Sequence, residues 1–293
     1  MNNTRMMLLG MSLAVAGSVV AAAQDAAPAP PKVIAIAREW VKPGKGGMVH
    51  DKSEAQFVAA SARAKLQGHY IALNAMTGKQ RALYMFRYPS FSAWEQDNKL
   101  IDKNPALAAE FDRLFMADGE LLESADLSVF TYSEEWSFHT RPAGVAQARY
   151  YEISSFHIRP GHRKEFGDCV KMVKEGNEKA GTSAHWGAYE IAYGGDDGTV
   201  IALTHRESLS EIDKGFDEGK KFAEAIGGEE AMHKLDDVCG QGIDSSHTEL
   251  FAINPKQSYA EDAWIKSDPD FWKPKSKAPE AEAAKPAAKP TSR

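Results

Sequence analysis

Three ionisable side chains in the second half of the sequence are of types that bind ligands or transfer protons. His157 lies near the end of the β-rich segment YYEISSFHI (150–158), and Glu190 and His205 lie on the next two predicted strands. Imidazole titrates near neutral pH, and a carboxylate accepts protons and hydrogen bonds. We therefore group His157, Glu190 and His205 as candidate ligand-binding residues of one pocket. The plain alternative for each histidine is a surface residue or a satisfied core residue.

Different polar residues occupy the matching positions of the first half. Arg38 and Trp40 alternate along VIAIAREWV (33–41), so both point to the same face of a predicted strand. Asn74 and Arg87 lie on the second and third predicted strands of that half. These four residues complete the set of candidate ligand-binding residues.

Local sequence motifs for catalysis or metal binding are absent. The chain has no His-x-x-x-His pair, no Cys-x-x-Cys pair and no Gly-x-Ser-x-Gly nucleophile motif. The run GKGG (44–47) follows a predicted strand but lacks the Lys-Ser/Thr ending of a phosphate-binding loop. We therefore predict no metal ion and no cofactor, assign no catalytic residue, and favour a protein that is not an enzyme.

The two cysteines, Cys169 and Cys239, both lie in the second half of the chain. Each falls on a predicted helix, and the two helices of a β-α-β-β-α-β unit pack side by side on one face of its sheet. A disulfide between them is therefore reasonable in an oxidising compartment. The alternative is a pair of buried free thiols, because cysteine is among the most frequently buried residues.

The sequence contains an internal repeat. VKPGKGGMVHD (41–51) matches IRPGHRKEFGD (158–168) at an offset of 117 residues, and GHYIALNAMTG (68–78) matches AHWGAYEIAYGG (184–195) at an offset of 116. The match continues into the next strand and helix of each half. A repeat of this extent predicts two units of the same fold.

Each unit predicts the same order of elements, β-α-β-β-α-β. A β-rich segment ends at Pro-Gly, and apolar residues then recur at helical spacing. Serines suited to N-caps open the second helix, and a β-rich segment closes each unit. The apolar residues of the first helix are Met48, Ala55, Val58, Ala62 and Leu66 in the first unit, and Phe166, Cys169, Val170 and Val173 in the second unit. The N-cap serines are Ser90 and Ser208, and the final strands are 127–132 and 248–253.

Each half resembles the dimeric α+β barrel superfamily. The marks are the ferredoxin-like order of elements, the K/R-P-G strand end and the run SFSAWE (90–95) before the second helix. NIPSNAP-like, antibiotic-biosynthesis-monooxygenase-like and EthD-like domains belong to that group. The resemblance implies an α+β fold in which two ferredoxin-like repeats, 33–137 and 148–255, pack sheet to sheet as a pseudo-dimer within one chain. The linker 138–147 is short, which favours direct packing over two independent domains.

The resemblance also suggests a cofactor alternative, because some relatives of this fold bind haem. Haem-degrading relatives use an Asn, a Trp and an axial His. The chain supplies these residue types at Trp40, Asn74, His157 and His205. Haem is therefore the alternative to a protein without a cofactor.

Both ends of the chain predict segments outside the repeat. Residues 1–23 combine a basic start, an apolar run of about 15 residues and a final Ala-Ala-Ala, which indicates a cleaved export signal rather than a membrane span. The other segments are a Pro/Ala spacer (24–32), an aromatic arm (256–272) and an Ala/Pro/Lys tail too poor in apolar residues to fold (273–293). We expect a periplasmic or secreted protein that does not span a membrane.

Charge restricts the partners of this protein. Residues 24–272 carry 28 Lys and Arg against 39 Asp and Glu, whereas the tail carries six against two. An acidic body argues against nucleic acid as a partner. The basic tail is either a solvated spacer or a contact with an anionic envelope surface.

These observations lead to two main hypotheses for function. The first is an exported protein that binds a small molecule or acts as an accessory, and that is monomeric because one chain supplies both halves of the barrel. The second is a cofactor-independent or haem-dependent monooxygenase-like enzyme with a pocket in the second repeat. A pocket lined by His157, His205 or Glu190 with apolar walls favours the enzyme. A self-assembling interaction protein is a third hypothesis.

Overall fold

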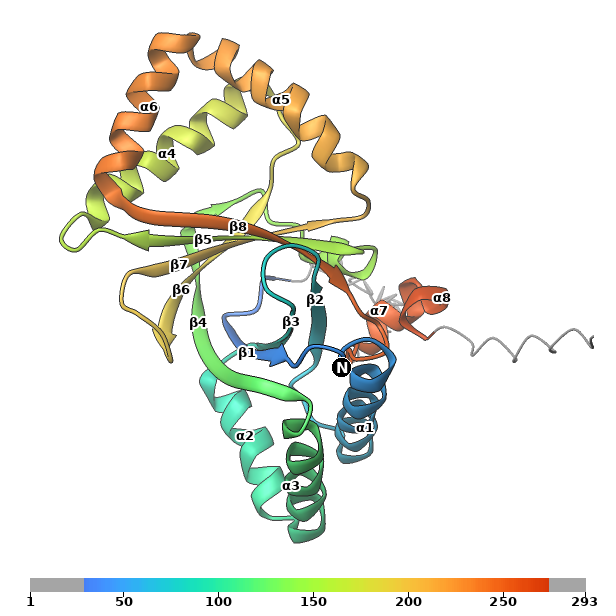
Figure 1. The fold of residues 1–293 in the computed structure, drawn as a ribbon. Helices are drawn as coiled ribbons and strands as arrows, with labels where there is room; N and C mark the ends of the chain where they lie inside the picture. Colours follow the sequence, from blue (N-terminus) through green and yellow to red (C-terminus); the bar gives the residue numbers. More distant parts are fainter. Residues whose placement is uncertain (1–28, 274–293) are drawn as a thin grey trace, which may run out of the picture.

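The computed structural model describes residues 29–273, which form one closed antiparallel β-barrel of eight strands with helices outside it (Figure 1). Hydrogen-bonded neighbours follow the order β1-β3-β2-β8-β5-β7-β6-β4, and β4 pairs with β1 to close the ring. The strands are β1 (Val33–Val41), β2 (Tyr70–Ala75), β3 (Arg81–Tyr88), β4 (Leu122–Phe138), β5 (Tyr150–Ile158), β6 (Trp186–Tyr193), β7 (Thr199–Arg206) and β8 (Ile243–Ile253).

A reciprocal exchange of strand contacts joins the two halves of the barrel. The last strand of the first half, β4, pairs with β6, which is the second strand of the second half. In the same way, β8 pairs with β2. A closed barrel leaves no strand edge unpaired, so the hydrogen bonding of each half depends on the other.

The helices of the two halves lie on opposite sides of the barrel (Figure 1). Three long helices come from each half, and two short helices and a 3₁₀ helix complete the described segment. They are α1 (Met48–Ala64), α2 (Phe91–Asp102), α3 (Pro105–Gly119), η1 (Pro142–Ala146), α4 (Arg163–Ala180), α5 (Ser210–Ile226), α6 (Glu229–Gly242), α7 (Asp262–Ser267) and α8 (Pro269–Trp272).

The single second helix predicted for each unit is wrong, because the structure has two helices there. In the first half, Pro105 occupies the first turn of α3, and the side chain of Asn104 accepts a hydrogen bond from the backbone N–H of Leu107 (3.2 Å). In the second half, Gly227 and Gly228 have φ of 122° and 79°, which a helix cannot continue through. Each half therefore runs β-α-β-β-α-α-β.

Other predicted element ends agree with the structure in part. The strands 33–41 and 150–158 are confirmed, and Ser90 caps α2 as predicted. In the second half, α5 begins after Leu209 rather than at Ser208. The final strands begin at Leu122 and Ile243, earlier than predicted, because they also pair along the full length of β1 and β5.

The predicted apolar face of α1 is wrong at three of its five positions. Met48, Ala55 and Ala62 are exposed, whereas the ionisable residues His50 and Glu54 are buried. In α4, by contrast, Phe166 and Cys169 are buried as the helical spacing predicts. The buried face of α1 therefore begins with charged rather than apolar side chains.

Apolar side chains fill the interior of the barrel. Because side chains alternate along a strand, Ile34 and Ile36 of β1 point inward, as do Tyr151 and Ile153 of β5. Residues between them face the helices. Which face a residue occupies therefore follows from its parity along the strand.

The aromatic arm packs against this core. Trp264 of α7 and Trp272 of α8 are buried, and the indole N–H of Trp272 donates a hydrogen bond to the carbonyl of Ala146 (2.8 Å). The guanidinium of Arg87 lies 4.7 Å from the ring of Trp264 and pairs with Glu261. The arm is therefore part of the barrel core and not only a surface cover.

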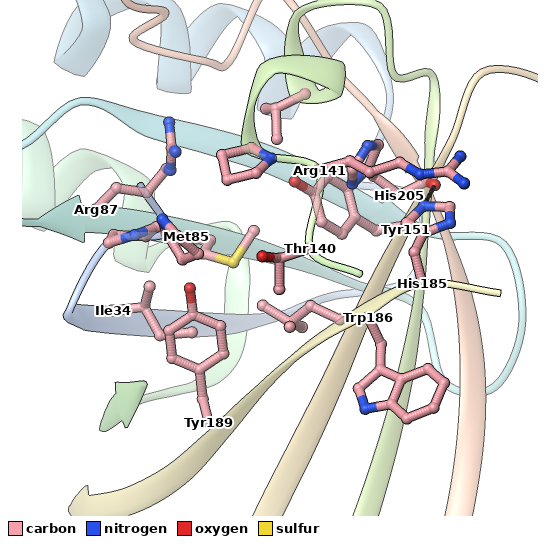
Figure 2. Close-up of a pocket in the computed structure, with 16 residues that line it drawn as sticks. Ile34, Met85, Arg87, Thr140, Arg141, Tyr151, His185, Trp186, Tyr189 and His205 are labelled. Carbon is pink, nitrogen blue, oxygen red and sulfur yellow. Dashed lines mark hydrogen bonds between the residues drawn. The ribbon is translucent and has the colours of Figure 1, made fainter. Parts of the chain in front are cut away.

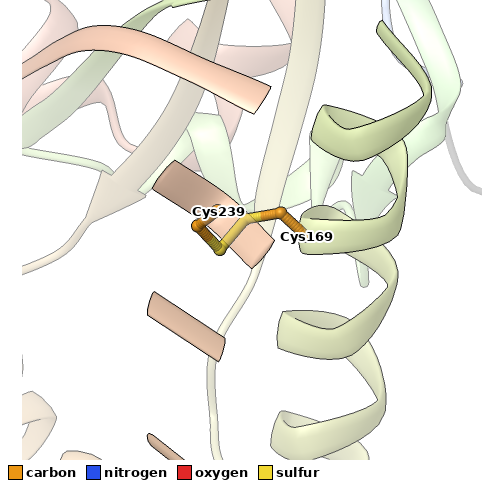
Figure 3. Close-up of a disulfide and its surroundings, with 2 residues drawn as sticks. All are labelled: Cys169 and Cys239. Carbon is orange, nitrogen blue, oxygen red and sulfur yellow. A yellow bond between two sulfur atoms is a disulfide. The ribbon is translucent and has the colours of Figure 1, made fainter. Parts of the chain in front are cut away.

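Cys169 of α4 and Cys239 of α6 form a disulfide (Figure 3). Their Cα atoms are 4.8 Å apart, and the bond joins residues separated by 70 positions in the sequence. It ties two helices on the same side of the barrel, so neither cysteine is a free thiol.

Within residues 29–273, every helix is too short or too polar to cross a lipid bilayer. The predicted export signal (1–23), most of the spacer (24–32) and the tail beyond residue 273 lie outside the described residues. The interpretation of those segments stays a prediction.

Candidate functional site

A cavity of about 60 Å³ lies at one end of the barrel interior (Figure 2). Inward-facing residues of five strands and the segment that joins the two halves form its walls. They include Ile34, Met85, Tyr151, Tyr189, Leu203 and His205. Of the candidate residues, the structure brings Arg87 and His205 to this cavity.

His205 faces the cavity because Ile201 and Leu203, which share its face of β7, point into the barrel core. Burial, and after it the charges of the neighbouring His185 and Arg141, lower the pKa of His205 to about 4. The imidazole is therefore neutral at pH 7. A Cβ atom on Gly144 would lie 2.5 Å from Nε2 of His205, so this glycine leaves the space that the ring occupies.

His185 lies beside His205 at the cavity wall, with the two ring centres 4.9 Å apart. Its Nδ1 lies 3.2 Å from the carbonyl oxygen of Ser183, and its Nε2 lies 3.1 Å from the carbonyl oxygen of His205. Burial lowers the pKa of His185. Since a neutral imidazole donates from one nitrogen only, one of these two contacts is a hydrogen bond at a time.

Two tyrosines provide hydroxyl groups to the cavity. Burial raises the pKa of Tyr151 to about 12 and also raises the pKa of Tyr189. Both hydroxyls stay protonated at neutral pH and can donate hydrogen bonds. Figure 2 shows Tyr189 on the wall opposite Arg141 and His205.

Two arginines differ in how their charge is balanced. Arg87 pairs with Glu261 of the aromatic arm, so its charge is already neutralised. Arg141 is exposed at the mouth of the cavity, and its Nη2 donates to the carbonyl of Ser183 (3.3 Å). Arg141 is therefore the cation that a ligand in this cavity meets first.

A larger cavity of about 370 Å³ lies on the other side of this wall, between the sheet and the helices of the second half. Arg141, His185 and Trp186 line both cavities. Apolar side chains of α4, α5 and α6 contribute to the larger one, as do the paired Glu152 and Arg206. The two cavities form neighbouring compartments of one candidate site.

The structure corrects the expectation that His157, Glu190 and His205 share one pocket. His157 pairs with Thr199 at one end of β5, whereas His205 pairs with Tyr151 near the other end. Six residues along a strand span about 20 Å. Glu190 faces outward and binds Arg163 of α4 through two hydrogen bonds of 2.6 and 2.9 Å.

The first-half candidates are also dispersed. Arg38 shares the inward face of β1 with Trp40, as predicted, but it is bound to Asp126 and Ser128, at 2.6 Å in each case. Four residues separate it from Ile34 of the cavity, or about 13 Å along the strand. Asn74 lies between two inward-facing residues of β2 and so faces outward.

Sequence reasoning missed Arg141, His185, Tyr151 and Tyr189 as lining residues. Arg141 lies in the predicted linker, and His185 lies in the repeated segment 184–195, just before a predicted strand. Because side chains alternate along a strand, Tyr151 shares a face with Ile153, and His205 shares a face with Leu203. This alternation could have placed Tyr151 and His205 together inside the barrel. No local pattern in the sequence indicates that the linker packs against this end of the barrel.

A second group of ionisable residues, also missed, lies in the first half. Glu39, His50, Glu54 and Asp118 approach one another behind the barrel wall, and their ligand-type atoms all lie within 4.8 Å. Burial, and after it the charges of Glu39 and Asp118, raise the pKa of Glu54 to about 10. The spacing of His50 and Glu54 at i and i+4 on a helix was the available signal.

Sequence comparison gives no relatives for this chain. No protein-family model matches it, and no curated protein matches it.

Solved structures do match the fold. An anthrone oxidase-like protein superposes with a TM-score of 0.50 and 12% sequence identity, over 78% of this chain and 94% of that one. A provisionally named monooxygenase from Fusobacterium nucleatum gives 0.49 and 9%, over 76% and 93%. Chlorite dismutase from Candidatus Nitrospira defluvii gives 0.44 and 9%, over 80% and 95%.

At such identities the likeness concerns the fold alone. That fold has mixed α+β content and one eight-stranded antiparallel sheet. Membership of the dimeric α+β barrel superfamily stays a prediction.

The described residues of the candidate site do not fit haem. The smaller cavity, at about 60 Å³, is far below the roughly 300 Å³ at which ordinary cofactor sites begin. Among the residues that line the larger cavity, His185 is the only imidazole, and both of its ring nitrogens face backbone carbonyl oxygens. No lone pair of His185 is directed at an iron atom in that cavity.

Proposed function

We propose that this is an exported protein that binds a small amphipathic molecule bearing a carboxylate or a similar hydrogen-bond acceptor. The acceptor group lies in the small cavity, and the apolar part extends into the larger one. The observation that carries this proposal is the wall of Arg141, His185 and Trp186, which borders both cavities.

The chemistry of the small cavity favours an acceptor. Its lining offers the hydroxyls of Tyr151 and Tyr189 and the exposed guanidinium of Arg141, and it includes no Asp or Glu. A carboxylate can accept two parallel hydrogen bonds from an arginine, and such charge-assisted bonds are about twice as strong as neutral ones. The cavity has room for a group of a few atoms.

The larger cavity supplies the apolar part of the site. Its volume of about 370 Å³ lies in the range of small-molecule sites, and Val173, Phe222 and Leu235 are among its lining residues. A ligand with an aromatic ring or a short alkyl chain would bury that part here.

The state of His205 favours binding over catalysis. An imidazole with a pKa of about 4 is neutral at pH 7 but is a weak base. General bases work best when their pKa lies near the operating pH. His205 is therefore better suited to line a pocket than to take a proton from a substrate.

Export and the fused architecture form part of the same proposal. A disulfide persists in oxidising compartments, which supports a periplasmic or secreted location for the domain after removal of residues 1–23. The reciprocal pairing of β4 with β6 and β8 with β2 supports a tandem fusion of two ferredoxin-like repeats, 33–137 and 148–255. NIPSNAP-like or antibiotic-biosynthesis-monooxygenase-like ancestry is the corresponding hypothesis of origin.

Calorimetric titration with phenylacetate and octanoate tests the binding function. We expect saturable binding to the wild-type protein and an affinity about tenfold lower for Arg141→Ala, which loses a charge-assisted pair. Arg113→Ala, at an exposed position of α3, is the matched control and should bind like the wild type. Absence of binding, or equal affinity in both variants, contradicts the proposal.

Two experiments on the same protein sample test the monooxygenase-like alternative. One structural neighbour is an anthrone oxidase-like protein, so an anthrone is the compound to test. Dioxygen consumption in its presence would favour the enzyme. A Soret band on addition of haemin that is lost in His205→Ala would favour the haem-dependent form. We expect neither signal.

A further inference from the structure

Four ionisable side chains meet between the barrel and the helices α1 and α3. Nε2 of His50 lies 3.1 Å from Oε2 of Glu39, 3.8 Å from Oδ1 of Asp118 and 3.9 Å from Oε1 of Glu54. The three residues His50, Glu54 and Asp118 are each at most 4% exposed. This cluster shares no residue with the two cavities of the candidate site.

Several polar atoms of the cluster have no partner among the described residues. Oε1 of Glu54 and Oδ1 of Asp118 are buried without a hydrogen bond, and so is the hydroxyl of Tyr84. Tyr84 is 4% exposed, and its hydroxyl lies close enough to Glu54 and Glu39 to influence both carboxyl groups. An unpaired buried polar atom costs about 1–3 kcal/mol, and charged groups cost more. Three such atoms at one point form a set that a bound cation or other ligand would satisfy.

The fold itself does not require this cluster. Glu39 is the seventh residue of β1, and the seventh residue of β5 is Phe156, which packs with Trp136 and Phe166 in an apolar cluster. A buried set of charges can be replaced by apolar side chains without loss of stability. The second half does so, and the first half keeps the charged groups.

We propose that Glu39, His50, Glu54 and Asp118 bind one divalent first-row transition cation, Mn²⁺ or Zn²⁺. The four residues come from β1, α1 and α3, so the ion would cross-link the barrel wall to two helices. Nothing in the proposed ligand-binding function depends on this site.

The spacing of the donor atoms fits such an ion. A cation with bonds of about 2.1 Å places neighbouring ligand atoms roughly 3.0–3.4 Å apart in octahedral or tetrahedral geometry. The distances of 3.1, 3.8 and 3.9 Å from His50 approach this range, and rotation of the carboxyl groups can close the remainder. The three carboxylates and one imidazole supply enough donors.

The donor set and burial favour a transition ion over Ca²⁺ or Mg²⁺. Imidazole is a good ligand for transition ions, whereas Ca²⁺ takes six to eight oxygen atoms and Mg²⁺ usually keeps several waters. The buried site leaves little room for waters. On the far side of the ring, the amide nitrogen of Gln257 lies 3.4 Å from Nδ1 of His50. Metal binding through Nε2 leaves the proton on Nδ1, so the Gln257 amide must turn over and accept that proton with Oε1, which is otherwise buried without a partner.

Metal uptake by the full chain tests this proposal. The protein, without an affinity tag, is treated with EDTA, dialysed, and equilibrated with Mn²⁺ or Zn²⁺ before elemental analysis. We expect one ion per chain and a rise of about 5–10 °C in melting temperature at a hundredfold excess over the dissociation constant. Uptake of neither ion at stoichiometric level overturns the proposal.

Variants localise the bound ion. Asp118→Asn and Glu54→Gln should lose stoichiometric Mn²⁺ uptake and the metal-induced rise in melting temperature. Asp112→Asn, at an exposed position of the same helix α3, should keep both. In EDTA, the two cluster variants should melt no lower than the wild type, because Asp118→Asn removes one of several crowded charges and Glu54→Gln replaces a carboxyl group that burial already keeps protonated. If they bind Mn²⁺ like the wild type, the ion lies elsewhere and the assignment is wrong.

Discussion

The ring centre of His205 lies 4.9 Å from that of His185, although one residue is the second-last of β7 and the other directly precedes β6. The contact places two imidazoles at the wall of the barrel cavity beside Arg141. Burial and these neighbours keep both rings neutral at pH 7.

Acidification should destabilise the protein partly through His205. Its pKa falls from an ordinary 6.5 to about 4 in the folded state, so between these values the unfolded chain binds more protons. The free energy of unfolding therefore decreases as pH falls from about 7 to 4, by about 2 kcal/mol at pH 4.5. Urea unfolding at pH 7.0 and 4.5 should show a smaller loss for His205→Gln. If His247→Gln and His205→Gln lose the same free energy of unfolding between these two pH values, His205 is not the cause of the acid destabilisation.

Gly144→Ala should disturb the candidate site directly. The new Cβ atom would lie 2.5 Å from Nε2 of His205, well inside normal contact distance. The ring must move into the cavity, with an expected loss of about 1–3 kcal/mol in stability and a lower affinity for carboxylates. Gly240→Ala is the control, because a Cβ atom there meets nothing within 4 Å and this residue lines neither cavity. If Gly144→Ala binds carboxylates with wild-type affinity, the His205 ring can move without blocking the cavity, and this prediction is wrong.

Removal of the disulfide should cost roughly 3–4 kcal/mol of stability, because the bond closes a loop of 70 residues. The double variant Cys169→Ala/Cys239→Ala and reduced wild type should give similar urea midpoints, both lower than oxidised wild type. Since neither cysteine lines a cavity, ligand affinity should stay unchanged. A midpoint unaffected by reduction would contradict this prediction.

The aromatic arm should contribute substantially to stability. Trp272 is 3% exposed in the core and donates to the carbonyl of Ala146. Trp272→Ala should lower the free energy of unfolding by about 3–5 kcal/mol, whereas Trp272→Phe, which keeps most of the bulk, should lose much less. Thermal or urea unfolding measures the difference. Similar stability of both variants and the wild type would mean that the arm only covers the surface.

Strands with local signals could be predicted from the amino-acid sequence alone. The segments 33–41 and 150–158 are β-rich and end at Pro-Gly, and the structure has strands with these bounds. The same alternation placed Arg38 and Trp40 on one face. The single second helix was wrong although Asn104-Pro105 and Gly227-Gly228 carried ordinary helix-ending signals.

Which side chains meet depends on how the distant segments of the chain pack together. Closure of the barrel sends His157 and His205 to opposite ends of paired strands, and it brings Arg141 of the linker to the end that holds His205. Glu39 and Asp118 meet His50 only because α1 and α3 pack together against β1. Hydrophobic periodicity and turn motifs depend on residues that are close in the sequence. The contacts of these side chains depend instead on strand register and helix docking between segments far apart in the chain.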